Sequence, residues 1–315
     1  MKKNRNTSYI VSIDKTILGC YLALLVIGLL VMLDISSVQS SMVNFYRHAI
    51  FVLISIFAAI ITLYFVKVDK LRPLNRWLVY LIIGLLVLVI FTGTKTKGAE
   101  RWLMLGPVGI QPSTLARLVL ILYFAGYLDT KQDKINLANV KELVIEFIPL
   151  ILYTTVIFIL IFLGKHLSTL IICGATLLGM LVYAGLRKRF VLGVLMLGII
   201  AGTVVITKGD SFRFDRINTY KVYSLLIPNR PEPRNSPEEY QVRESLTALT
   251  SGGFLGTGMA HGRAKHYFLP EARTDYIYTI IGEEFGFLGA ALVLLLHALL
   301  FFRIIKLSET QENRY

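Results

Sequence analysis

Charged side chains are scarce in this chain of 315 residues, because Lys, Arg, Asp and Glu together make up only 17% of it. An ordinary soluble domain carries roughly a quarter. Hydrophobic residues make up 55% of the chain, and its mean hydropathy is +0.64. The composition therefore excludes an ordinary soluble domain and indicates a membrane protein.

Cysteine is also rare: the chain has two, Cys20 and Cys173, and both lie inside apolar runs. This excludes a disulfide framework and a cysteine-based metal site. No tract is of low complexity, so collagen-like and disordered classes are excluded as well. A net charge of +13 without a hydrophilic body does not fit a nucleic-acid-binding protein, so no nucleic-acid partner is expected.

Long apolar runs are what the sequence has in abundance. A helix needs roughly 20 apolar residues to cross the hydrocarbon core of a bilayer. Eight runs of about this length occur, at residues 17–35, 48–66, 77–93, 110–128, 142–163, 169–186, 190–207 and 277–302. We therefore predict an all-α, polytopic membrane helix bundle with about eight transmembrane helices, and the first helix is expected to remain as an anchor.

The distribution of Lys and Arg predicts the orientation of these helices. With the N-terminus inside, the inner segments hold 17 Lys and Arg residues and the short outer loops hold five. Cytoplasmic loops carry the excess of positive charge. Both termini of this chain are therefore predicted to be cytoplasmic.

One connection is far longer than the others. We expect residues 1–315 to form a single membrane domain, with seven helices in 17–207, an extracytoplasmic loop at 208–276 and the eighth helix at 277–302. Loops of this length are generally functional or disordered. This loop carries proline-rich and glycine-rich stretches and leads directly into the eighth helix, so we expect it to fold over the outer ends of the helices. The glycine run 251–262 follows no βαβ strand and is expected to be a close-packed turn.

Ionisable residues at membrane depth are functional candidates, because burying them there is costly. Arg117 lies in the fourth predicted helix, and Glu283 and Glu284 lie in the eighth. Asp275 stands at the outer start of the eighth helix, after Thr274 as its expected N-cap. Structural alternatives are that Asp275 only begins the helix and that Arg117 only forms an ion pair with Glu100, Glu283 or Glu284.

Two stretches carry more specific information. Segment 97–106 reads KGAERWLMLG and is followed at 111–117 by QPSTLAR. Segment 268–278 reads FLPEARTDYIY and continues at 281–286 as IGEEFG. These segments closely resemble the N-G-A-x-R-W-x-x-L-G, Q-P-S-E-x-x-K, L-P-E-x-H-T-D-F-I-F and I-G-E-E-L-G motifs of the SEDS family, which is typified by FtsW, RodA and SpoVE.

This resemblance implies a bacterial inner-membrane glycosyltransferase that polymerises lipid II, and lipid-linked glycan, into peptidoglycan strands. It implies a class B penicillin-binding protein as partner, together with divisome or elongasome proteins. Asp275 matches the essential aspartate of the family and is the predicted catalytic residue. The predicted substrate-binding residues are Arg101, Trp102, Gln111, Ser113, Arg117, Glu271, Arg273 and Glu283. Alternatively, Arg101 is a structural ion-pair partner and Trp102 belongs to an interfacial aromatic belt.

The sequence departs from the family pattern at several positions. Thr114 stands in place of the glutamate after Q-P-S, Arg117 in place of the lysine, and Arg273 in place of the histidine before T-D. The family motif P-D-L-G-T appears as KHLST at 165–169, where His166 has no other histidine or carboxylate spaced to join it in a metal site. Typical members also have two helices beyond the eight predicted here.

We expect Asp275 to accept the proton of the attacking sugar hydroxyl. Arg101, Arg117 and Arg273 would stabilise the departing pyrophosphate. A divalent cation, Mg²⁺ or Mn²⁺, bound at Asp275 is permitted by the resemblance. A lipid II transporter and a non-catalytic scaffold for the penicillin-binding protein are the alternative functions. The sequence around Tyr276 favours a division role over elongation.

Overall fold

The computed structural model describes residues 13–38, 41–96, 99–105, 108–132, 140–164, 166–207, 218–224, 228, 232–233 and 236–310. The chain divides into two compact units. The first unit comprises Met1–Val66 and Ile206–Gln311, and the second comprises Lys67–Val205 with Glu312–Tyr315.

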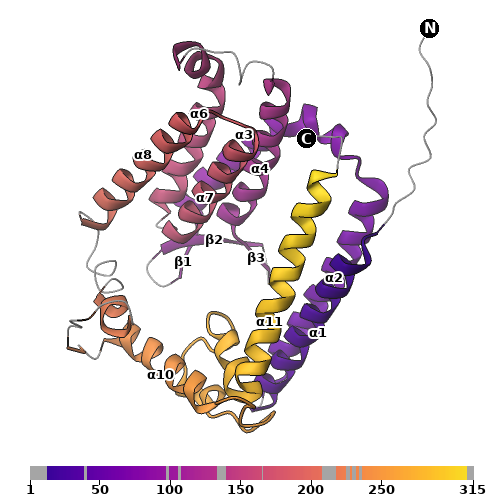
Figure 1. The fold of residues 1–315 in the computed structure, drawn as a ribbon, viewed down its shortest axis with the longest axis vertical. Coiled ribbons are helices and arrows are strands. Elements are labelled where there is room, and N and C mark those ends of the chain that lie inside the picture. Colours follow the sequence, from indigo (N-terminus) through magenta and orange to yellow (C-terminus); the bar gives the residue numbers. More distant parts are fainter. Residues whose placement is uncertain are drawn as a thin grey trace. The chain divides into compact units, whose positions relative to one another are not determined.

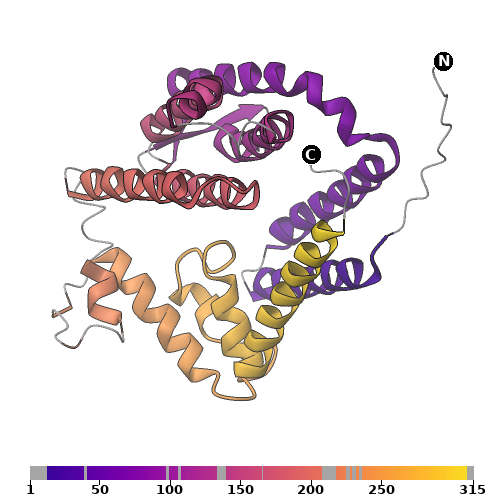
Figure 2. The ribbon, with the colours of Figure 1, turned by 45° about the horizontal axis from the view of Figure 1, so that its top comes forward.

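The first unit is built around two long apolar helices, Lys15–Val38 and Ile277–Glu309, which lie side by side. Its helices are α1 (Lys15–Val38), α2 (Val43–Phe65), α10 (Pro237–Ser251), the short π-helical turn η2 (Ala264–Phe268) and α11 (Ile277–Glu309). Helix α1 packs against both α2 and α11, and α10 and η2 pack against α11 (Figure 1, Figure 2). The described part of the long predicted loop therefore folds onto α1 and α11.

A buried apolar cluster joins these elements. It includes Val31 and Ile35 of α1, Leu269 and Ala272 after η2, and Ile280 of α11. Ile35 and Ile280 are fully shielded from solvent. The loop residues between η2 and α11 are therefore part of the core of this unit.

Helix α11 is broken at one residue. Gly286 has φ 65° and ψ −162°, which lies outside the helical region. A positive φ is accessible to glycine at little cost because it has no Cβ atom. The last helix therefore consists of two helical segments that meet at Gly286.

The second unit is mainly helical with a small sheet. Its elements are η1 (Val68–Leu74), α3 (Asn75–Thr92), β1 (Thr94–Thr96), β2 (Ala99–Leu105), β3 (Val108–Ile110), α4 (Pro112–Thr130), α6 (Val140–Leu163), α7 (Leu167–Tyr183) and α8 (Lys188–Thr207). One face of α3, formed by Val79, Ile82 and Leu86, is buried. This spacing of three and four residues places the side chains on one side of a helix, and α3 packs against α4 and α6.

The sheet is a feature that the all-α prediction missed. The strands are antiparallel in the order β1-β2-β3, and Trp102 of β2 lies opposite Thr94 of β1. A Cβ atom at Gly109 would lie 3.0 Å from the Trp102 ring, so glycine gives the indole room. The strands lie next to the ends of α3 and α4 (Figure 1).

Each of the eight predicted apolar runs coincides with a helix. Among the described residues, five helical stretches are long and apolar enough to cross a membrane: Lys15–Val38, Val43–Phe65, Lys70–Thr92, Ile145–Leu163 and Ile277–Glu309. The prediction of a polytopic membrane helix bundle is confirmed, whereas the number of eight crossings stays a prediction.

Candidate active site

The glycine-rich segment 252–258 lies directly on the break in α11. The Thr257 amide donates to the Glu283 carbonyl at 2.9 Å, and the Gly258 amide donates to the Glu284 carbonyl at 3.0 Å. The Thr257 hydroxyl also donates to the Glu283 carbonyl, at 3.1 Å. Because Gly286 interrupts the helix, these loop donors satisfy carbonyls at the end of the first helical segment.

The same segment satisfies the amides on the other side of the break. The Phe287 amide donates to the Gly253 carbonyl at 2.9 Å, and the Leu288 amide donates to the Phe254 carbonyl at 3.3 Å. A Cβ atom at Gly256 would lie 2.0 Å from the Glu284 carbonyl oxygen. The predicted close-packed turn is therefore confirmed.

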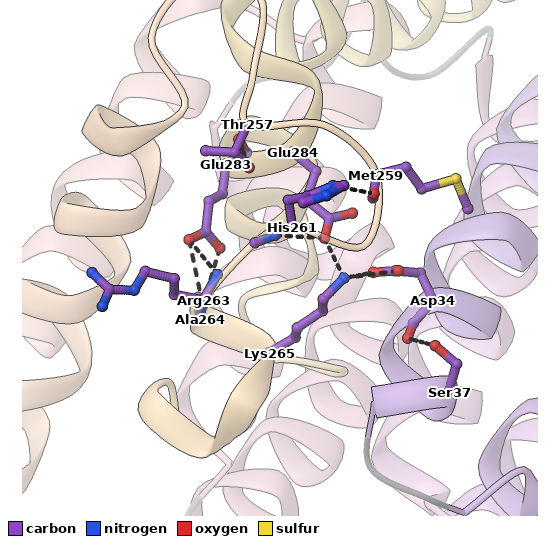
Figure 3. A network of polar contacts seen from close by, with 11 residues as sticks. Asp34, Ser37, Thr257, Met259, His261, Arg263, Ala264, Lys265, Glu283 and Glu284 are labelled. Atoms are coloured by element: carbon purple, nitrogen blue, oxygen red, sulfur yellow. Dashed lines mark hydrogen bonds and ion pairs between the residues drawn. The ribbon is translucent and has the colours of Figure 1, made fainter.

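A buried ionic network links the loop to two helices (Figure 3). The Lys265 Nζ atom lies 2.8 and 2.6 Å from the two carboxylate oxygens of Asp34 and also forms an ion pair with Glu284. The side chain of Lys265 is 0% exposed, and those of Asp34 and Glu284 are 4% and 1% exposed. Removing one partner from such a network leaves an uncompensated buried charge, so the network fixes η2 to α1 and α11.

Glu283, a predicted substrate-binding residue, is buried beside this network. Its carboxylate accepts the amides of Arg263 at 2.8 Å and Ala264 at 3.1 Å (Figure 3). These contacts give Glu283 a structural role in holding the loop. A direct contact between Glu283 and substrate stays a prediction.

Asp275 lies on the turn between η2 and α11. The carbonyl of Glu271 accepts the amides of Thr274 and Asp275, both at 3.1 Å. Glu271 has a φ of 57°, and Ala272 beside it is 4% exposed. The turn is therefore tightly hydrogen-bonded and anchored in the core.

The side chains of Asp275 and Arg273 are exposed on this turn. The Asp275 carboxylate forms no hydrogen bond or ion pair with any residue that the structure describes. The hydroxyl of Thr274 donates to Glu271 Oε2 at 3.1 Å, while α11 begins at Ile277 after Tyr276. The prediction of Thr274 as the N-cap is therefore wrong, because its hydroxyl bonds within the turn.

The second unit carries the other predicted residues. Arg101 and Trp102 lie in β2, and the side chain of Arg101 lies outside what the structure describes. Gln111 precedes α4, Ser113 is 7% exposed in its first turn, and Arg117 is exposed one turn later.

His166 brings the two altered motifs of this unit together. The Ser113 hydroxyl lies 2.7 Å from His166 Nδ1, and the Thr169 hydroxyl lies 3.0 Å from the same atom. The Gln111 amide nitrogen lies 3.4 Å from His166 Nε2, and the Thr114 hydroxyl donates to the Gln111 Oε1 atom at 3.0 Å. Predicted residues Gln111 and Ser113 thus share one polar cluster with His166, which the sequence had not linked to them.

The sequence reasoning also missed Asp34 and Lys265. Asp34 was detectable, because it is a carboxylate inside the first apolar run, where ionisable residues are costly. Lys265 gave no such signal because it lies in the long loop. Glu284 forms its ion pair with Lys265, and an ion pair of Glu284 with Arg101 or Arg117 stays a prediction.

No group of three His, Cys, Asp or Glu side chains in the described parts of the chain is placed to hold a metal ion. At the Asp275 turn, the second carboxylate, Glu271, already bonds to Thr274. Mg²⁺ or Mn²⁺ at Asp275 therefore stays a prediction.

These features define a multi-pass membrane protein whose polar residues gather in loops and at helix ends. Residues 14–315 match the FtsW/RodA/SpoVE family of cell cycle proteins. The chain therefore belongs to this family, as the motifs predicted.

Named relatives and solved structures agree with this assignment. A probable peptidoglycan glycosyltransferase FtsW from Legionella pneumophila is 30% identical over 96% of this chain and 76% of its own length. The protein of the same name from Aeromonas salmonicida is 30% identical over 94% and 73%.

The fold resembles that of a chain in a structure described as "Structural coordination of polymerization and crosslinking by a peptidoglycan synthase complex". The TM-score is 0.71 and the sequence identity is 21%, and the match covers 96% of this chain and 80% of that one. It also resembles Thermus thermophilus rod shape determining protein RodA, with a TM-score of 0.63, 20% identity, and coverage of 95% and 76%.

Proposed function

We propose that this chain is a peptidoglycan glycosyltransferase that polymerises lipid II into glycan strands, with Asp275 as the general base. The names of its relatives support the activity, and the name FtsW supports a role in cell division. The observation that carries the proposal is the exposed Asp275 carboxylate on a turn anchored in the protein core.

In the proposed reaction, the sugar 4-hydroxyl of one lipid-linked unit attacks the anomeric carbon of another. A new C–O bond forms, the bond to the lipid pyrophosphate breaks, and the hydroxyl proton passes to the Asp275 carboxylate. A positioned general base contributes about 10²–10⁴-fold in rate. Because both substrates are held in one leaflet by their lipid tails, binding them side by side lowers the entropic cost of their encounter.

A single displacement with inversion needs only one carboxylate acting as base. A covalent sugar intermediate would need a second carboxylate about 5 Å away. Glu271 is on the same turn, but its Oε2 atom accepts the Thr274 hydroxyl. We propose the single displacement because it is the simplest scheme and needs one carboxylate.

Arginine side chains are proposed to bind the departing pyrophosphate. Arg273 is exposed two residues before Asp275, and Arg117 is exposed on α4. A guanidinium keeps its charge and can form paired hydrogen bonds to phosphate oxygens. Arg101 and a divalent cation are further proposed contributors, although no step of the mechanism depends on the cation.

The general-base assignment is tested with Asp275→Asn in purified protein supplied with lipid II. The amide keeps the size of the side chain but cannot accept the proton, so we expect glycan strands to disappear from the gel. Glu232→Gln is the matched control because it removes an exposed carboxylate elsewhere in the same loop. Strand formation by Asp275→Asn at the wild-type rate would refute the assignment.

A lipid II transporter is a second candidate that one observation favours. Transporters often contain discontinuous helices around a central binding site, and α11 is interrupted at Gly286. In the described helices this is the one interruption with non-helical backbone. A transporter built from two structural repeats would have two such interruptions, one in each repeat. A flipping assay in vesicles separates the two functions, because a polymerase that is not a transporter leaves lipid II in its original leaflet.

A scaffold for a class B penicillin-binding protein is the third candidate, favoured by Thr114 and His166 at altered family positions. Such a partner is also proposed for the enzyme, and the solved peptidoglycan synthase complex supports it. A scaffold would bind the transpeptidase and yield no glycan in the gel assay. We further propose that the chain lies in the bacterial inner membrane with both termini cytoplasmic.

A further inference from the structure

The second unit contains a cavity of about 540 Å³ between α3, α4 and α6. Four tyrosines line it, Tyr80, Tyr123, Tyr127 and Tyr153, together with the guanidinium-bearing Arg76. Lys131 and Glu146 complete its charged lining. The cavity therefore presents hydroxyl groups and two cationic side chains against one carboxylate.

Several of these polar groups already have partners. Lys131 Nζ lies 2.6 Å from Glu146 Oε2, and the Tyr127 hydroxyl donates to the Glu146 carbonyl. The hydroxyls of Tyr80 and Tyr153 lie 2.8 Å apart. These contacts neutralise the single carboxylate and leave its surroundings with a net positive charge.

Two hydrogen-bond donors in the cavity lining, Tyr123 and Arg76, lack such partners among the described residues. The Tyr123 side chain is 5% exposed and the Arg76 guanidinium is exposed at the cavity. Neither forms a hydrogen bond or ion pair with any residue that the structure describes. A guanidinium offers five N–H donors and a tyrosine hydroxyl offers one, so the cavity has donors available for an anionic acceptor.

The cavity is remote from the polar cluster of Gln111 and Ser113. Tyr127 and Lys131 lie at the C-terminal end of α4, whereas Ser113 lies in its first turn. A helix of 19 residues is about 28 Å long at 1.5 Å per residue. The cavity lies at the end of the unit where Lys67, Lys70 and Arg72 are found, which the charge distribution predicts to be cytoplasmic.

Ile145 lines the cavity, and α6 and α3, which also line it, carry further exposed apolar side chains. Ile145 is 65% exposed, Ile148 is 51% exposed and Leu152 is 56% exposed on α6, while Leu81 of α3 is 59% exposed. Such surfaces suit acyl chains, whereas a soluble phosphate compound would make no use of them. We propose that this cavity binds the phosphate group of an anionic phospholipid, with Arg76 and Tyr123 as donors and the acyl chains lying along α6 and α3. Basic pockets between membrane helices are a recurring form of lipid headgroup recognition.

The test measures lipid binding to the purified full chain in neutral detergent by native mass spectrometry. The probes are dihexanoyl phosphatidylglycerol, which is anionic, and dihexanoyl phosphatidylcholine, which is zwitterionic. We expect saturable binding of the anionic lipid, about tenfold weaker binding in Arg76→Gln, and about threefold weaker binding in Tyr123→Phe. Arg189→Gln is the matched control because it removes an exposed arginine outside the cavity on the side of the protein predicted to be cytoplasmic.

Equal binding of the anionic lipid by Arg76→Gln, Tyr123→Phe and the wild type would overturn the proposal. So would an equal loss in Arg189→Gln, because that result would indicate a general effect of charge. Displacement of the lipid by inorganic phosphate at a similar concentration would overturn the lipid as the source of the phosphate group. Tyr123→Phe removes one oxygen atom and keeps the ring, so it remains informative if Arg76→Gln folds poorly.

Discussion

The buried lysine of the first unit offers the sharpest test of how the candidate active site is held. Replacing Lys265 by Met keeps a long side chain but leaves the carboxylates of Asp34 and Glu284 without their cation. All three side chains are at most 4% exposed. Breaking a buried ion pair by removing one partner costs about 3–5 kcal/mol. We therefore expect Lys265→Met to lower the free energy of unfolding by about that amount.

The assay is equilibrium unfolding of the purified protein in mixed detergent micelles. Lys306→Met is the matched control, because Lys306 is an exposed lysine on the same helix α11, and we expect a change within about 0.5 kcal/mol. A triple variant with Lys265→Met, Asp34→Asn and Glu284→Gln removes all the charges together. It should recover much of the loss, because the cost comes from uncompensated charge.

A free energy of unfolding for Lys265→Met within about 1 kcal/mol of the wild type would refute this reasoning. A triple variant as unstable as Lys265→Met would show that packing of the lysine stem, and not charge compensation, accounts for the loss. Activity should follow stability, because Lys265 and Asp275 belong to the same anchored segment.

Two further predictions concern the loop and the ends of the long helices. Gly256→Ala would place a Cβ atom 2.0 Å from the Glu284 carbonyl oxygen, at a residue whose φ is +86°. We therefore expect a clear fall in the melting temperature. Gly193→Ala is the neutral control, because nothing lies within 4 Å of a Cβ atom at that position. The hydrogen bond from Arg303 lowers the pKa of Asp14 below its ordinary value of 3.8. The stabilising effect of this pair is present above pH 3.8 and is lost as the pH falls through the lowered pKa of Asp14. Thermal unfolding of Asp14→Asn should lack this part of the acid dependence, and an unchanged dependence would contradict the role of the pair.

The helices could be predicted from the sequence because each depends on a local excess of apolar residues. Their ends were less predictable. The run expected at 48–66 forms part of α2, which begins at Val43 and includes Arg47, since a charged residue near a helix end does not stop the helix. The strands at 94–110 were missed because they are short and lie between two stronger apolar runs.

The candidate site was only partly predictable. The exposed turn around Asp275 follows from a motif that is contiguous in the sequence. The contact between Lys265 and Asp34 joins residues 231 positions apart, and the cluster of Ser113 with His166 joins residues 53 positions apart. Such pairs depend on how helices pack, which local periodicity does not contain.

The interrupted helix α11 also has a consequence for building chimeric proteins. Its two segments receive hydrogen bonds from, or donate them to, residues 253–258, so the loop and the helix should be exchanged together. If the loop of a relative were grafted without that relative's last helix, these hydrogen bonds would be mismatched. Transplanting residues 236–309 as a single block would preserve them.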